Sequence, residues 1–114
     1  MSSAQSAVVE LRFTRDAEAD LLAVQLYTRE SFGASVWSRY RAALTTAFRS
    51  LQDNPYLGAD RSSVRAGTRR LLCRQHVIYY EVLPTSILVL RVLGVRQDPS
   101  AHLPLATTPP DTGS

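Results

Sequence analysis

Two apolar stripes with helical spacing, separated by one glycine, constrain the fold of this chain more than any other feature of its sequence. A helix that buries one face repeats apolar residues every three or four positions. The first stripe contains Ala17, Leu21, Val24 and Tyr27, and the second contains Trp37, Tyr40, Leu44, Phe48 and Leu51. Because almost nothing separates the stripes, we expect an antiparallel helix hairpin whose apolar face packs on a second layer.

The predicted ends of both helices carry suitable residues. Thr14 lies where a helix N-cap is needed, and acidic residues that favour a helix N-terminus follow it. Gly33 is a suitable C-terminal stop for the first helix. The second helix is expected to end in "DNPYLG" (53–58), where Pro55 and Gly58 prevent its continuation.

The remaining ordered sequence predicts strands. One strand is expected at 8–13, before the helices, and three follow a polar connection at 59–67. Those three are expected at 68–74, 76–83 and 87–96, with short links that favour an antiparallel meander. We therefore predict an α+β fold of order β-α-α-β-β-β, with the hairpin on one face of a mostly antiparallel twisted sheet. The other face is expected to be uncovered, or nearly so.

Arg91 raises a question about the last strand, because it stands within an otherwise apolar run. Strand residues alternate between faces, so Leu88, Leu90 and Val92 share one face while Arg91 shares the other with Ile87 and Val89. If the Leu90 face meets the helices, Arg91 points to the open face. The opposite parity buries Arg91 and requires a carboxylate partner. The sequence leaves both possibilities open.

Length and composition exclude several classes of protein. The 114 residues suit one domain at 8–103, with a flexible tail at 1–7 and a disordered Pro/Thr/Ser-rich tail at 104–114. There is no apolar run of about 18 residues and no signal peptide, so a cytoplasmic protein without membrane contact is expected. Cys73 is the single cysteine, and no cluster has metal-ligand spacing, so neither metal nor cofactor is expected.

The charge of the chain indicates the kind of partner it can bind. All thirteen basic residues are arginine and the net charge is +3, which suits an acidic protein or a nucleic acid as partner.

Four segments in order resemble the ParE/RelE-type toxins of bacterial type II toxin–antitoxin systems. They are "AEADLLAVQLYTRESFG", "YRAALTTAFRSLQDNPYLG", "VRAGTRRLLCRQHVIYYEV" and "LRVLGVRQDPSAHL". The resemblance covers roughly residues 8–103. It implies the RelE/ParE toxin fold and a cognate antitoxin whose flexible C-terminal segment, acidic or amphipathic, wraps and neutralises the toxin. It also implies that operator DNA is contacted only through the antitoxin.

The resemblance divides between two targets. Ribonucleases of the RelE-like branch typically place an arginine where this chain has Val77, and Gly94 stands where many relatives have histidine. We therefore interpret the chain as ParE-like: a non-enzymatic inhibitor of DNA gyrase that blocks replication and growth, of the kind associated with plasmid stabilisation. The segments "DNPYLG" and "RQDPSAHL" agree with that branch. The expected partner-binding residues are Arg69, Arg70, Arg74, Arg91 and Arg96.

Two alternatives remain. One is a RelE-like, ribosome-dependent mRNA endoribonuclease that uses Arg74, Arg96 and His102, since in-line attack by a 2′-hydroxyl requires proton transfer and cations around the phosphorane. The other is a degenerate, non-toxic module that only binds its antitoxin. His76 is expected to be structural, and no serine has a paired base.

Overall fold

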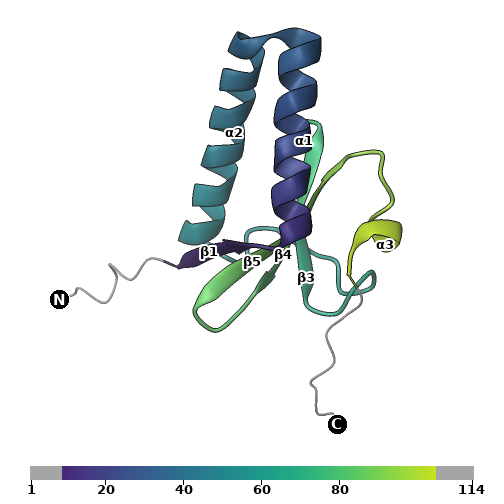
Figure 1. Cartoon of the computed structure of the whole chain (residues 1–114). Helices are drawn as coiled ribbons and strands as arrows, with labels where there is room; N and C mark the ends of the chain where they lie inside the picture. The colour runs from purple at the N-terminus through teal and green to yellow at the C-terminus, as the bar shows by residue number, and fades with distance from the viewer. Residues whose placement is uncertain (1–8, 105–114) are drawn as a thin grey trace, which may run out of the picture.

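The computed structural model describes residues 9–104 of the chain. Two long helices form a hairpin beside a five-stranded sheet (Figure 1). The elements in order are β1 (Glu10–Phe13), α1 (Arg15–Phe32), α2 (Ala34–Asp53), β2 (Ala59–Asp60), β3 (Thr68–Cys73), β4 (His76–Val82), β5 (Ser86–Gly94) and α3 (Pro99–His102). The predicted α+β fold is confirmed, with β2 and α3 as additions. No helix among residues 9–104 has the length and apolar character needed to cross a bilayer.

The sheet has the strand order β1-β5-β4-β3-β2. The β3-β4-β5 part is the predicted antiparallel meander, and β1 pairs with β5 in parallel. The parallel pairing follows from the helix hairpin, which carries the chain away from β1 and lets it return from the opposite edge. The two-residue β2 falls in the segment expected to be a polar connection, and it pairs with Arg69 and Arg70 of β3.

The ends of the helices agree with the predicted caps. The Thr14 hydroxyl oxygen accepts a hydrogen bond from the Ala17 amide at 3.0 Å and donates to the Leu90 carbonyl at 2.8 Å, so this cap also attaches α1 to β5. Gly33 has φ +93°, a left-handed conformation that glycine adopts without steric cost. Its amide donates to the Arg29 carbonyl, which completes the last turn of α1.

Apolar side chains of the helix hairpin and of one sheet face form the main core. Its buried members are Ala17, Leu44, Leu51, Cys73, Ile78, Tyr80, Ile87, Val89 and Val92. A smaller cluster of Val77, Tyr79 and Leu93 occupies the other face of the sheet. Tyr79 and Tyr80 are therefore both buried, one in each cluster.

A β-bulge in β5 answers the question raised by Arg91. Tyr79 pairs with Arg91, whereas the next residue, Tyr80, pairs with Val89, so Leu90 has no partner on β4. The extra residue shifts the alternation, and Val89 and Val92 both enter the main core although they are three positions apart. Neither parity derived from strict alternation applies to the whole strand, and that part of the prediction is wrong.

The second face of the sheet is not open, contrary to expectation. Leu103 packs against the Val77, Tyr79 and Leu93 cluster. The carbonyl of His102 accepts a hydrogen bond from Arg91, and the carbonyl of Pro104 accepts one from Arg65. We call residues 98–104 the C-terminal strap. The flexible tail predicted at 1–7 lies outside the described residues, as does all of the tail predicted at 104–114 except Pro104.

Candidate functional site

Arg91 is the best connected of the five arginines predicted to bind a partner. Its Nε and one terminal nitrogen donate to the two carboxylate oxygens of Asp20 on α1, at 2.7 and 2.8 Å. The other terminal nitrogen donates to the His102 carbonyl at 2.8 Å. The hydrogen bonds that Arg91 donates to the Asp20 carboxylate raise the pKa of Arg91 above its already high ordinary value. Arg91 thus joins α1, β5 and the C-terminal strap, and its hydrogen-bonding capacity is directed inward.

Asp20 completes this connection at the edge of β5. Beyond the last residue paired with β1, the backbone of β5 would leave the amide of Val92 without a partner. A carboxylate oxygen of Asp20 accepts that amide at 2.9 Å. Asp20 is one of the acidic residues after Thr14 that were expected only to favour the helix N-terminus, and its contacts with β5 could not be inferred from spacing in the sequence.

Arg65 has a related role that the sequence interpretation missed. Its side chain is buried and forms an ion pair with Glu81 at 3.1 Å, while Nε donates to the Pro104 carbonyl at 3.1 Å. Arg65 therefore attaches the end of the strap to β4. No local pattern marks this role, because the acceptors that a buried guanidinium requires, Glu81 and Pro104, lie 16 and 39 positions away along the chain.

Arg69 is likewise engaged within the molecule. Its Nε donates to the Gly58 carbonyl at 3.0 Å and a terminal nitrogen donates to the Tyr56 carbonyl at 3.2 Å. Its guanidinium carbon also lies 5.3 Å from the centre of the Tyr56 ring, within cation–π range. Arg69 thus holds the 54–58 loop against β3.

Arg70, Arg74 and Arg96 differ from the other two, since none of their side chains forms a hydrogen bond or ion pair with residues 9–104. Arg70 is half-buried on β3. Arg74 is exposed in the two-residue turn between β3 and β4 and has φ +57°. Arg96 is also exposed, but it follows the strand rather than ending it, because β5 stops at Gly94.

The two histidines occupy different settings. His76 lies beneath α2, where its Nδ1 is hydrogen-bonded to the Tyr40 hydroxyl and the two rings pack edge to face. Burial lowers the pKa of His76, although the charge of Asp20 opposes this shift. The expected structural role of His76 fits these contacts. His102 lies in α3, and its backbone carbonyl is the atom that contacts Arg91.

The residues of the ribonuclease alternative are not joined by direct contacts. No hydrogen bond or ion pair among residues 9–104 links Arg74, Arg96 and His102. Val77 is only 4% exposed and packs beneath Leu103. The described residues also contain no group of three or more histidine, cysteine or acidic side chains able to hold a metal ion.

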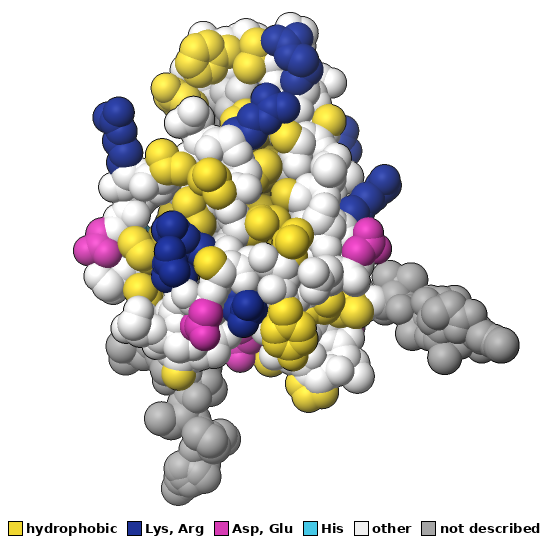
Figure 2. Space-filling view, turned by 180° about the vertical axis from the view of Figure 1, so that it is seen from behind, with side chains coloured by type: hydrophobic (Ala, Val, Ile, Leu, Met, Phe, Trp, Pro, Cys, Tyr) yellow, Lys and Arg dark blue, Asp and Glu magenta, His cyan; other side chains and the backbone are white. Residues whose placement is uncertain are grey.

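Hydrophobic side chains also reach the surface of the helix hairpin. In a view from behind, they extend from the tip of the hairpin towards the sheet, with arginines around them (Figure 2). Leu22, Leu26, Tyr27 and Phe32 of α1 are each at least half exposed. Tyr27 and Phe32 pack edge to face near the end of α1, with ring centres 6.2 Å apart.

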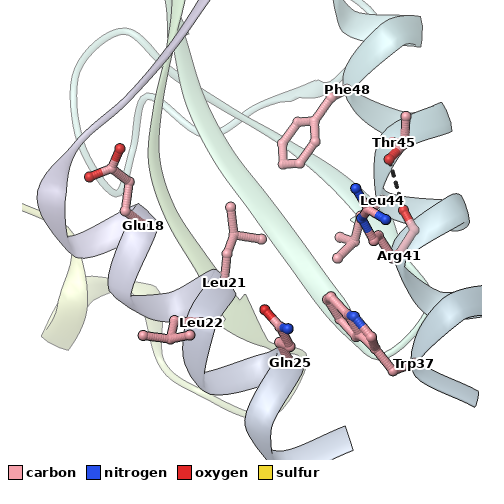
Figure 3. Close-up of a pocket in the computed structure, with 9 residues that line it drawn as sticks. All are labelled: Glu18, Leu21, Leu22, Gln25, Trp37, Arg41, Leu44, Thr45 and Phe48. Atoms are coloured by element: carbon pink, nitrogen blue, oxygen red, sulfur yellow. Dashed lines mark hydrogen bonds between the residues drawn. The ribbon is translucent and has the colours of Figure 1, made fainter. Parts of the chain in front are cut away.

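A groove of about 350 Å³ separates the two helices (Figure 3). Leu21 and Leu22 line one side, and Trp37, Leu44 and Phe48 line the other. Polar groups at the groove include Glu18 and Gln25 of α1 and Arg41 of α2. The groove is thus an apolar channel with charges of both signs at its margins, suited to an amphipathic helix or extended segment.

Comparison with known proteins identifies the family. The family model described as "ParE toxin of type II toxin-antitoxin system, parDE" matches residues 11–99. The chain belongs to the ParE toxin family. Toxin ParE1 of Caulobacter vibrioides is 29% identical over 92 residues, which cover 81% of this chain and 95% of ParE1. Toxin ParE3 of the same organism is 30% identical over 90 residues, covering 79% of this chain and 90% of ParE3.

A solved structure supports the same assignment. A chain of the chromosomal ParDE toxin–antitoxin system from P. aeruginosa matches with a TM-score of 0.67 and 25% identity. The match covers 79% of this chain and 99% of the other. The predicted resemblance is therefore confirmed: this is a toxin of the ParDE type II class. The predicted partner-binding residues stay predictions. Two of them, Arg69 and Arg91, contact other parts of this chain, and three have no side-chain partner among residues 9–104.

Proposed function

We propose that this ParE-family toxin inhibits DNA gyrase by binding it, and that a cognate antitoxin neutralises the toxin. The observation that carries the proposal is the family match across residues 11–99. The proposed consequence is blocked replication and growth arrest. Contact with operator DNA would be made through the antitoxin.

Burial of Val77 favours gyrase over the ribosome as the target. A ribonuclease of this fold needs cations and a proton acceptor around the scissile phosphate. The corresponding face of β4 presents Val77 and Tyr79, both buried with Leu93 beneath Leu103. A phosphate group there would meet an apolar surface instead of a guanidinium, which supports action by binding.

The groove between α1 and α2 is the proposed seat of the antitoxin. An amphipathic segment could place apolar side chains between Leu22 and Trp37 and direct charged ones towards the rim. Such a contact would also cover the exposed side chain of Leu22. The antitoxin segment would then be ordered only on binding, as is usual for flexible recognition segments.

A gyrase assay tests the proposed target. Purified toxin, gyrase, ATP and relaxed plasmid are incubated, and supercoiled and cleaved DNA are measured after denaturation of the protein. Loss of supercoiling with accumulation of linear DNA is the expected result. Unchanged supercoiling, together with mRNA cleavage in a translating extract, would instead establish the ribonuclease function. A folded chain that neither arrests growth nor affects either target would identify a non-toxic binding module.

A pair of α1 variants tests the proposed antitoxin seat. Leu22→Glu places a charge in the groove, whereas Leu26→Glu places one on the same helix outside the groove lining. Both residues are at least half exposed, so both variants should fold. Leu22→Glu should weaken antitoxin binding by at least about tenfold, the effect of burying an unpaired charge at an interface. Equal affinities of the two variants, measured by calorimetry, would rule out the groove.

A further inference from the structure

A shallow hollow lies between α2 and the turn that joins β3 to β4. It has a volume of about 520 Å³ and is lined by Arg39, Ala42, Ala43, Thr46 and Arg74. Neither arginine forms a hydrogen bond or ion pair with any residue from 9 to 104. No carboxylate lines the hollow, so both positive charges remain available to an external anion.

The backbone at Arg74 has a conformation that is uncommon for arginine. Arg74 is the first of two turn residues and has φ +57°, where glycine, asparagine and aspartate are preferred. The Arg74 side chain forms no hydrogen bond within this turn. An exposed arginine at a turn position that favours glycine, asparagine or aspartate is consistent with a role for its side chain outside the fold.

A third arginine lies at the same end of the sheet. The amide of Val95 donates to the carbonyl of Gln75 at 2.9 Å, which places Arg96 within one residue of the turn that carries Arg74. Arg96 is exposed and also lacks a partner among the described residues. We call Arg39, Arg74 and Arg96 the turn-end arginines.

We propose that the turn-end arginines bind the phosphate backbone of duplex DNA. Guanidinium groups bind phosphate oxygens in pairs and retain their charge at every physiological pH. The floor of the hollow consists of alanine and threonine side chains, so it lacks the aromatic or large apolar anchors on which protein interfaces depend. These anchors lie instead on α1 and in the groove between the helices.

This inference rests on the proposed function and deepens it. Gyrase holds DNA while it acts, so a toxin bound to gyrase would lie beside that DNA. Backbone contacts carry no sequence information. The turn-end arginines therefore add affinity for gyrase-bound DNA of any sequence. They do not replace operator recognition through the antitoxin.

The test measures DNA binding without gyrase. Fluorescence anisotropy of a short labelled duplex is recorded with the full-length toxin between about 50 and 200 mM salt. Three phosphate contacts predict a slope of log K against log salt of about −2.7. The variant Arg39→Gln/Arg74→Gly retains one contact, so its slope should be shallower, at about −0.9. Glycine suits the turn conformation at position 74, so this variant should melt no earlier than the wild type.

A charge-matched variant provides the control. Arg12→Gln/Arg49→Gln removes the same two charges from β1, at the opposite edge of the sheet, and from a different part of α2. It should keep the wild-type slope. If both double variants lost the same amount of salt dependence, net charge alone would explain duplex binding, and the proposal would be overturned. Competition by polyglutamate as strong as by unlabelled duplex would identify an acidic protein as the ligand and also overturn it.

The outcomes separate this inference from the proposed function. A toxin that inhibits gyrase but does not bind the duplex refutes the DNA contact and leaves gyrase inhibition in place. A toxin that binds the duplex through the turn-end arginines but leaves supercoiling unchanged refutes only the gyrase proposal.

Discussion

At the scale of single residues, the arginines fall into two groups. Some form hydrogen bonds that connect elements of this chain, and others are exposed without a partner among the described residues. Arg65, Arg69 and Arg91 donate mainly to carbonyls and carboxylates of this chain. Arg74 and Arg96 have no such partners among residues 9–104. A loss of function therefore has a different meaning for each group: unfolding of the toxin for the first, and loss of an external contact for the second.

Arg91→Ala tests whether Arg91 stabilises the fold by connecting α1, β5 and the C-terminal strap. It leaves the Asp20 carboxylate partly buried without its cation and removes the donor to the His102 carbonyl. We expect the free energy of unfolding to fall by roughly 3 kcal/mol, measured by urea denaturation, because breaking a buried ion pair from one side exposes the full desolvation cost of the other. Arg96→Ala is the control and should change stability by less than about 0.5 kcal/mol. Similar stabilities for the two variants would contradict the assigned role of Arg91.

Thr14 and Gly33 illustrate what could be predicted at this scale. A cap depends on residue type and immediate neighbours, so local sequence identifies it. The ion pair between Asp20 and Arg91 joins residues 71 positions apart, and the bulge at Leu90 that orients Arg91 has no local signal. Both depend on how α1 and β5 meet in three dimensions.

At the scale of elements, length decides what the sequence predicts. The two helices span 18 and 20 residues, so their periodicity is unambiguous. By contrast β2 has two residues and α3 has four, too few for a period to be recognised. The strap that contains α3 is held by Leu103 and by arginines from distant elements. Contacts made only in the folded chain explain why the covered sheet face was missed.

The loop after α2 packs tightly around Gly58. The Tyr80 hydroxyl donates to the Pro55 carbonyl and accepts the Gly58 amide, both at 2.8 Å. A methyl group at Gly58 would lie 2.5 Å from the Arg70 carbonyl oxygen and 2.6 Å from the Tyr80 hydroxyl. Gly58→Ala should therefore cost about 1–3 kcal/mol of unfolding free energy through overpacking.

Gly94→Ala is the matched control for Gly58→Ala. Its nearest neighbour would be Gln97 Oε1 at 3.5 Å, an ordinary contact. Thermal denaturation should show a clear decrease in melting temperature for Gly58→Ala and almost none for Gly94→Ala. Equal melting temperatures would mean that the 54–58 loop moves freely and that the "DNPYLG" glycine has no packing role.

At the scale of the whole molecule, stability should depend on pH through His76. The imidazole is half-buried and packs edge to face against Tyr40, and this burial lowers its pKa in the folded state. The unfolded chain keeps an ordinary pKa near 6.5, so it binds more protons than the folded chain in the range just below that value. The free energy of unfolding therefore falls as pH decreases through about 6.5.

Two carboxylates do not contribute to this dependence. Hydrogen bonds from Ser62 and Ser100 lower the pKa values of Asp60 and Asp98, so these carboxylates keep their charge in this range.

His76→Gln tests this dependence, because the amide oxygen of glutamine can still accept the Tyr40 hydroxyl while the side chain no longer titrates. Urea midpoints are measured at about pH 7.5 and about pH 5.5, on either side of the unfolded histidine pKa. The wild-type midpoint should decrease at the lower pH and the His76→Gln midpoint should change much less. A parallel decrease in both proteins would assign the dependence to other groups. His76 would then be sufficiently hydrated to titrate normally, and the contact between α2 and the β3–β4 turn would be looser than the structure indicates.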